Sequence, residues 1–328
     1  MQIFKTPNYN FIKWRWHALV LSAVVIIAGV GLMIARGGLP LGIDFSGGTQ
    51  IVVKFTQPVS QSMVLDAIEG IAGEKVVQQY DNPADNSWLI RLPQIEGVEQ
   101  GASLEQGANQ VVAALQAAGL PKFEVIGTEF VGPVIGADLQ RKGLYATLAS
   151  IVGITLYIAF RFRPSFAFGA IVATFHDILV TLAFLSFFGY ELSLNIVAAI
   201  LTITGYSVND TIVVFDRVRE NFRTMRRDAL EEVINTAVNQ TLGRTIITAG
   251  TTFLSVLALF LFGGEVLHGF AFTMLVGIVS GTYSTIFIAA AIAIMLSQRK
   301  KTARTAPTSQ PATQSPRPRA KGRSARAS

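Results

Sequence analysis

The sequence predicts an α-helical membrane protein with six transmembrane helices and one α+β, ferredoxin-like domain outside the cytoplasm. Three observations lead to this prediction. Hydrophobic residues make up 51% of the chain and charged residues 15%, against roughly 25% charged residues in a soluble domain. Six apolar stretches are long enough to cross a bilayer. Between the first and the second, residues 37–140 alternate between strand-like and helix-like segments.

Each apolar stretch supplies about 20 residues, the length that crosses the hydrocarbon core of a bilayer. The first is too long for a signal-peptide core and precedes a poor cleavage site, so we expect it to remain as a membrane span. The predicted spans are residues 16–36, 143–160, 166–188, 194–215, 245–262 and 269–296.

Lysine and arginine gather at four places, and with six spans all four fall on one side of the membrane. These places are residues 1–15, the loop at Arg161 and Arg163, residues 217–227, and the segment after Gln298. The loops at 189–191 and 263–265 contain no base. The positive-inside rule therefore predicts cytoplasmic termini and places 37–140 outside.

The segment 37–140 holds four basic and twelve acidic residues, a balance that suits a domain kept away from the anionic inner leaflet. β-branched runs predict strands, and apolar residues at helical spacing predict helices. The predicted elements are strands at 49–55, 75–80, 87–92 and 122–131 and helices at 60–71 and 103–118. Their order, βαββαβ, is that of the ferredoxin-like split βαβ fold.

Two charged segments lie outside the predicted spans. Residues 216–241 carry five bases and five acids and predict a cytoplasmic amphipathic helix. Residues 298–328 carry nine bases and no acid and predict a disordered cytoplasmic tail. The tail fits a solubilising, positive-inside role, with contact to anionic lipid or to a ribosome as the alternative. No specific nucleic-acid site is indicated.

The strongest functional signal is an acid inside a span, because ionisable residues are costly in lipid and face a cavity or a partner. Asn209 and Asp210 interrupt the fourth span near its expected cytoplasmic end, and Thr202 and Tyr206 share their broad face. A carboxyl group there can gain and lose a proton as water access changes. The alternative is an interhelical hydrogen bond that only fixes packing.

The fifth span begins with an arginine that heads a polar stripe. Arg244 is followed at helical spacing by Thr248, Thr251 and Ser255. An arginine keeps its charge when buried, so Arg244 facing Asp210 would hold that carboxylate ionised until a conformational change separates them. The alternative is an arginine whose side chain reaches the cytoplasmic headgroups.

His176 and Asp177 lie side by side in the middle of the third span. Both titrate, so they are candidates for proton handling, with a structural His–Asp bond as the alternative. The sixth span has no charge, and Gly277, Ser280 and Ser284 predict close helix contact rather than chemistry. We expect no metal site, since no third ligand accompanies the His–Asp pair, and no nucleotide site, since no Walker sequence is present.

Four segments resemble the SecD/SecF family of protein-export membrane proteins. Residues 42–49 (GIDFSGGT) resemble its GxDFxGG segment, and 130–139 (FVGPVIGADL) resemble the segment that leads into its second span. Residues 205–217 (GYSVNDTIVVFDR) and 239–245 (NQTLGRT) are similar to the SecF signatures of spans four and five. The resemblance extends from residue 1 to about residue 297, and the single outside domain is similar to a separate SecF chain rather than a fused SecDF chain.

The resemblance implies half of an RND-type bundle, paired with SecD in the bacterial cytoplasmic membrane. It implies no enzymatic activity and no cofactor. It implies instead that the proton-motive force assists late translocation of a preprotein through the SecYEG channel with the SecA ATPase, with a proton or a sodium ion as coupling ion. The family's proton-site carboxylate maps to Asp210 and its partner arginine to Arg244. Two alternatives stay open: half of an RND-type small-molecule exporter, and a passive assembly scaffold.

Overall fold

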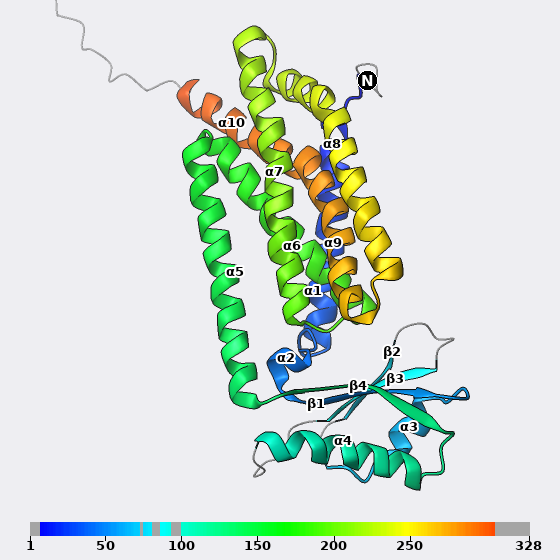
Figure 1. The fold of residues 1–328 in the computed structure, drawn as a ribbon. Coiled ribbons are helices and arrows are strands. Elements are labelled where there is room, and N and C mark those ends of the chain that lie inside the picture. Colours follow the sequence, from blue (N-terminus) through cyan, green and yellow to red (C-terminus); the bar gives the residue numbers. More distant parts are fainter. Residues whose placement is uncertain (1–6, 73–74, 81–85, 93–99, 306–328) are drawn as a thin grey trace, which may run out of the picture.

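The computed structural model describes residues 7–72, 75–80, 86–92 and 100–305. A bundle of helices is joined at one end to a domain built on a four-stranded sheet (Figure 1). The start of α1 and the end of α10 lie at the opposite end of the bundle (Figure 1). The described parts of the four predicted basic places lie at that end, and the domain lies at the other (Figure 1).

Six helices are long and apolar enough to cross a membrane, as the sequence predicts. The last of them is interrupted by a π-helical turn, a feature that often lies at functional sites. The bundle elements are η1 (Ile12–Trp14), α1 (Arg15–Ala35), α5 (Pro133–Arg161), α6 (Pro164–Phe188), α7 (Leu194–Thr224), α8 (Leu230–Phe262), α9 (Glu265–Ser284), the π-helical turn η3 (Thr285–Ala289) and α10 (Ala290–Thr305).

Three helices form the inside of the bundle. In the most apolar 18-residue segment of each span, 50%, 44% and 67% of the residues are buried at α6, α7 and α9. The corresponding shares at α1, α5 and α8 are 17%, 6% and 11%. Small residues permit this packing: a Cβ on Gly277 of α9 would lie 2.1 Å from the Ile203 side chain of α7. The weakly buried helices leave broad apolar faces for lipid or another chain to cover.

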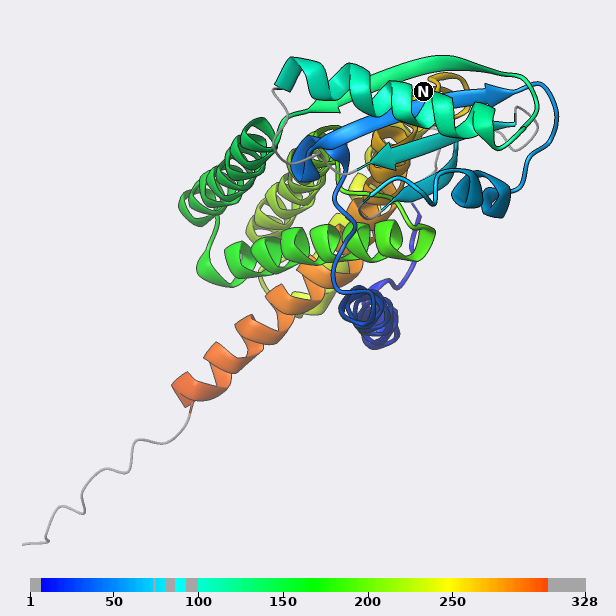
Figure 2. The same cartoon turned by 90° about the horizontal axis from the view of Figure 1, so that it is seen from below.

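Three helices differ in extent from the predicted segments. Residues 216–241 do not form one amphipathic helix, because α7 continues to Thr224 and α8 begins at Leu230 after a short turn. Helix α5 begins at Pro133 and so starts inside the predicted domain 37–140. The predicted disordered tail starts too early, because α10 continues to Thr305; residues 306–328 lie outside the described residues. Helix α10 leaves the bundle sideways (Figures 1 and 2).

The domain has the predicted βαββαβ order and an antiparallel sheet ordered β2-β3-β1-β4, which confirms the ferredoxin-like arrangement. Helices α3 and α4 cover the sheet on the side away from the bundle (Figures 1 and 2). The elements are α2 (Ile43–Ser46), β1 (Gly48–Phe55), α3 (Gln61–Ala67), β2 (Val76–Tyr80), β3 (Ser87–Leu92), α4 (Gln100–Ala117) and β4 (Phe123–Val131).

Alternation along the strands gives the two faces of the sheet different partners. Ile51, Val53 and Ile90 are fully buried in one core cluster with Val111 and Leu115 of α4. Residues of the opposite parity, including Gln78 on β2 and Arg91 on β3, contact residues at the domain end of the bundle. One face of the sheet thus makes the domain core, and the other faces the membrane helices.

Candidate functional site

Asp210 lies within α7 and packs against α8. One carboxylate oxygen, Oδ1, accepts a hydrogen bond of 2.7 Å from the Thr245 hydroxyl. The other, Oδ2, is buried and has no hydrogen-bond partner among the residues that the structure describes. A buried carboxylate oxygen without a partner is costly. A proton, a cation or a group from another chain would satisfy such an oxygen.

Arg244 precedes Thr245 on α8 but forms no ion pair with Asp210, or with any other acid in the described part of the chain. Its side chain is exposed, and the neighbouring Thr245 is the residue that contacts Asp210. The predicted pairing of Arg244 with Asp210 therefore stays a prediction that requires another conformation or another chain.

The predicted polar residues around this site form an outward-facing strip. Asn209 and Thr202 on α7 are exposed, and Tyr206 is half-buried. On α8, Thr248, Thr251 and Ser255 are exposed, and each hydroxyl donates to a carbonyl four residues earlier in its own helix. Because these hydroxyls donate to carbonyls of their own helix, they form no hydrogen bond with another described helix of this chain. The strip is therefore a polar surface within the span.

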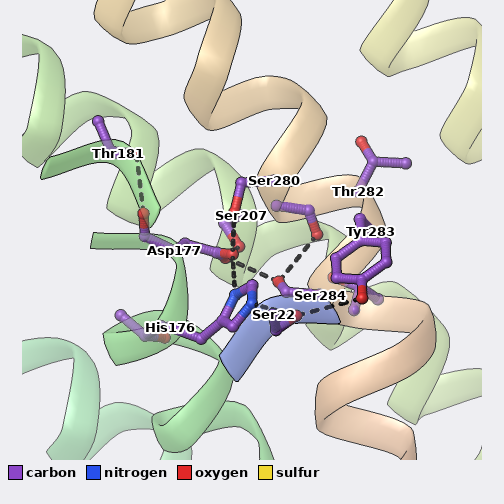
Figure 3. Close-up of polar contacts among 12 residues, drawn as sticks. Ser22, His176, Asp177, Thr181, Ser207, Ser280, Thr282, Tyr283 and Ser284 are labelled. Atoms are coloured by element: carbon purple, nitrogen blue, oxygen red, sulfur yellow. Dashed lines mark hydrogen bonds and ion pairs between the residues drawn. The ribbon is translucent and has the colours of Figure 1, made fainter. Parts of the chain in front are cut away.

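His176 and Asp177 lie in a different place, in the interior of the bundle (Figure 3). Asp177 is 1% exposed and accepts hydrogen bonds from Ser207 at 2.5 Å, from Ser280 and Ser284 at 2.8 Å each, and contacts His176 Nδ1 at 3.0 Å. All acceptor positions of this carboxylate are occupied. We call these five residues the Asp177 cluster.

The Asp177 cluster extends to the first helix. His176 Nε2 lies 2.9 Å from the Ser22 hydroxyl of α1, and Ser22 donates to Tyr283 of α9 at 3.1 Å. Tyr283 in turn donates to the Ala18 carbonyl at 2.6 Å. A continuous set of hydrogen bonds therefore ties α1, α6, α7 and α9 together (Figure 3).

Sequence reasoning missed Ser22, Ser207 and Tyr283, and it assigned Ser280 and Ser284 to packing alone. The spacing of Ser280 and Ser284, one helical turn apart in an apolar span, was the available signal. It did not identify Asp177 as their common acceptor, because that depends on how α9 is rotated against α6. Among the described residues no cluster of three or more His, Cys, Asp or Glu side chains is arranged to hold a metal ion.

Comparison with known proteins places the chain in a family. Residues 110–299 match "Protein export membrane protein SecD/SecF, C-terminal", and residues 33–59 match the SecD/SecF GG motif. The chain is 39% identical to the protein translocase subunit SecF of Escherichia coli O157:H7, covering 89% of each chain.

The chain belongs to the SecD/SecF family.

Within the SecD/SecF family it is of the SecF type, a membrane-embedded subunit of a protein translocase and not an enzyme. It is 42% identical to SecF of Magnetococcus marinus over 93% of this chain and 99% of that one. The crystal structure of SecDF from Thermus thermophilus, a translocon-associated membrane protein, superposes with a TM-score of 0.80 at 34% identity over 90% of this chain. The present chain spans 40% of that longer one.

The SecD/SecF GG motif forms the joint between α1 and the domain. Gly47 and Gly48 have φ angles of 71° and 114°, a backbone conformation that glycine tolerates and residues with a Cβ rarely adopt. This turn feeds β1 and positions Asp44, whose Oδ2 accepts a 2.8 Å hydrogen bond from the backbone N–H of Leu194, the first residue of α7. A carboxylate at a helix N-terminus satisfies a free N–H and complements the helix dipole.

The sheet is fastened to the same end of the bundle by charged contacts, which we call the domain junction. Arg91 on β3 pairs with Glu191 in the loop between α6 and α7 and donates to the Leu41 carbonyl at 3.0 Å. Gln78 on β2 donates to Glu191 at 2.9 Å. Burial lowers the pKa of Arg91, and the charge of Asp44 opposes that shift; an arginine remains a cation throughout.

Proposed function

We propose that this chain pairs with a SecD subunit and uses an ion gradient to assist a late stage of preprotein translocation through the SecYEG channel after the SecA ATPase has acted. The observation that supports this most directly is the buried, unpartnered Oδ2 of Asp210. In a membrane-spanning helix such an oxygen needs a proton, an ion or a partner group. The coupling ion is a proton or, with the same carboxylate as ligand, a sodium ion.

Asp210 and Arg244 act as the two states of a switch in this proposal. When Arg244 forms no ion pair with Asp210, as here, the carboxyl group accepts a hydrogen bond from Thr245 and binds a proton. When a rearrangement brings the guanidinium against Asp210, the ionised form is favoured and the proton leaves. The outward polar strip faces the SecD subunit, whose span would complete the path for the ion.

Helix α7 links the ion site to the domain. The N–H of its first residue donates to Asp44, and the loop before it carries Glu191 of the domain junction. Residues 194 and 210 are 16 positions apart, so roughly 24 Å of continuous helix separates the two ends. A shift or rotation of α7 at Asp210 therefore moves the attachment point of the domain. A SecDF structure in the super-membrane-facing form gives a TM-score of 0.65 at the same 34% identity, which supports more than one arrangement of parts in this family.

The Asp177 cluster holds the bundle together, since its carboxylate is fully hydrogen-bonded and joins three inner helices, α7 among them, to α1. Its acceptor positions are occupied, in contrast to those of Asp210. We therefore assign the ion-carrying role to Asp210 and a structural role to His176 and Asp177.

The termini are cytoplasmic and the domain is outside in this proposal. The bases of residues 13–15, 161–163 and 217–227 lie on elements at the bundle end opposite the domain (Figure 1). The positive-inside rule puts that end in the cytoplasm.

The function is tested by export of a preprotein into inverted membrane vesicles that contain the Sec channel with or without this chain and SecD. We expect the chain to increase late-stage completion of translocation only when an ion gradient is imposed. Collapsing the proton gradient and the sodium gradient separately identifies the ion. The same stimulation with both gradients collapsed would contradict gradient coupling and favour a passive scaffold.

The domain junction gives a second test. Arg91→Ala leaves the half-buried Glu191 without its cation, so we expect gradient-driven export to be lost although Asp210 is intact. In a double-mutant cycle with Glu191→Ala, we expect a coupling free energy of about 1–3 kcal/mol between Arg91 and Glu191. The matched control is the exposed pair Lys142–Asp138, which lies near the domain end of α5. We expect Lys142→Ala to change export little, because exposed pairs contribute about 0–1 kcal/mol. Additive effects of the two junction mutations would show that the contact does not transmit force.

A further inference from the structure

A basic cavity lies at the bundle end opposite the domain, between the corner that joins α5 to α6 and the last turns of α7. Its volume is about 520 Å³. Five arginines line it: Arg161, Arg163, Arg219, Arg223 and Arg226. These side chains take no part in the proposed ion transfer; they serve there only to orient the chain in the membrane, and their cytoplasmic position rests on that orientation.

The arginines are left with an excess of positive charge. Arg161 is neutralised by Asp216, whose two oxygens each lie 2.8 Å from its Nη2. The other four form no ion pair with any acid in the described part of the chain. Four exposed cations that converge on one cavity repel each other, so an anion that enters the cavity is stabilised.

The cavity also has an aromatic wall. Arg219 and Arg223 lie one turn apart near the end of α7, next to a buried strip that contains Phe215 and Val218, and Arg226 lies in the turn that follows the helix. Phe215 packs edge-to-face against Phe166, with ring centroids 5.1 Å apart, and against Phe162 at 5.8 Å. Cationic and apolar surfaces thus border the same space.

Phe160 distinguishes a lipid anion from a soluble anion as the ligand of this cavity. It is the penultimate residue of α5, lines the cavity beside Arg161 and is 90% exposed. At the end of a membrane-spanning helix, an exposed phenylalanine next to arginines marks the depth at which hydrocarbon gives way to headgroups. A free anion or a nucleic acid uses the arginines and leaves Phe160 in water, whereas a phospholipid covers both.

We propose that this cavity binds the headgroup of an acidic phospholipid. The lipid phosphate is held by the guanidinium groups of Arg219 and Arg223, which form paired hydrogen bonds to phosphate oxygens. The part of the acyl chains nearest the headgroup lies against Phe160. Basic pockets between membrane helices on the cytoplasmic side are suited to such headgroups.

The test is native mass spectrometry of the full chain with its SecD partner, released from mixed micelles that contain phosphatidylglycerol and phosphatidylcholine. The cavity variant is Arg219→Gln with Arg223→Gln. The matched control is Arg217→Gln with Arg227→Gln, which removes the same charge from the same helix end but outside the cavity. At about fivefold per arginine, we expect roughly 25-fold weaker retention of phosphatidylglycerol in the cavity variant and little change in the control.

Phe160→Gln separates a lipid from a soluble anion. We expect it to weaken phosphatidylglycerol binding severalfold while leaving binding of glycerophosphate unchanged. Equal losses in the cavity and control variants would mean that only overall charge matters and would overturn the proposal. Unchanged retention in the cavity variant, or tighter binding of an RNA oligonucleotide than of phosphatidylglycerol at the same arginines, would overturn it as well.

Discussion

Replacing Asp210 with asparagine is expected to abolish the gradient-dependent part of preprotein export while the protein still assembles. The side chains have nearly the same shape, and the amide oxygen can keep the 2.7 Å hydrogen bond from Thr245. The amide cannot take up and release a proton, and its NH2 group occupies the position of the unpartnered Oδ2. The measurement is export into vesicles with the gradient imposed and then collapsed, normalised to the amount of assembled complex.

The matched control is Glu220→Gln, another acid-to-amide change on α7. Glu220 is exposed and pairs with the exposed Arg217 at 2.7 Å, so its loss should leave the gradient response intact. An Asp210→Asn variant that keeps its gradient response would remove Asp210 from the ion path. An Arg244→Gln variant separates the proposed roles of Arg244 as switch and Asp210 as ion carrier. We expect it to bind the ion at Asp210 but to give no gradient-driven export.

Replacing Asp177 with alanine is expected to destabilise the bundle strongly. The change leaves His176 and the hydroxyls of Ser207 and Ser280, all of them buried, without their common acceptor. Some of these hydroxyls can turn to carbonyls of their own helices, as Ser284 already does toward Gly281 at 3.2 Å, which limits the loss. We expect a cost of about 2–4 kcal/mol, or roughly 5–10 °C in the thermal unfolding temperature of the purified protein.

Thr181→Ala serves as the control on the same helix. Thr181 is fully buried one turn from Asp177, but its hydroxyl donates to the Asp177 backbone carbonyl at 2.8 Å and not to the carboxylate. Its loss should cost about 1 kcal/mol. Asp177→Asn distinguishes the two roles considered for the pair. If this variant is stable and assembled yet gives no gradient response, His176 and Asp177 belong to the proton path, and our structural assignment is wrong.

The sequence by itself determined the number of spans, the domain order βαββαβ and the family. These features are local: hydropathy, strand and helix periodicity and contiguous motifs are read over 10 to 20 neighbouring residues. Asp210 could be identified in the same way, because an acid in an apolar run stands out without knowledge of its neighbours in space. The break between α7 and α8 was missed because residues 225–229, MRRDA, contain neither glycine nor proline.

The tertiary structure alone decided which polar residues meet. Ser22, Ser207 and Ser284 come from three helices, and only the rotation of those helices brings two of them to Asp177 and the third to His176. In the same way, the N–H of Leu194 at the start of α7 donates to Asp44, which is 150 residues earlier in the chain. A carboxylate with every acceptor position filled and one with a buried free oxygen look alike in sequence, because the difference lies in the hydroxyls that packing brings within about 3 Å.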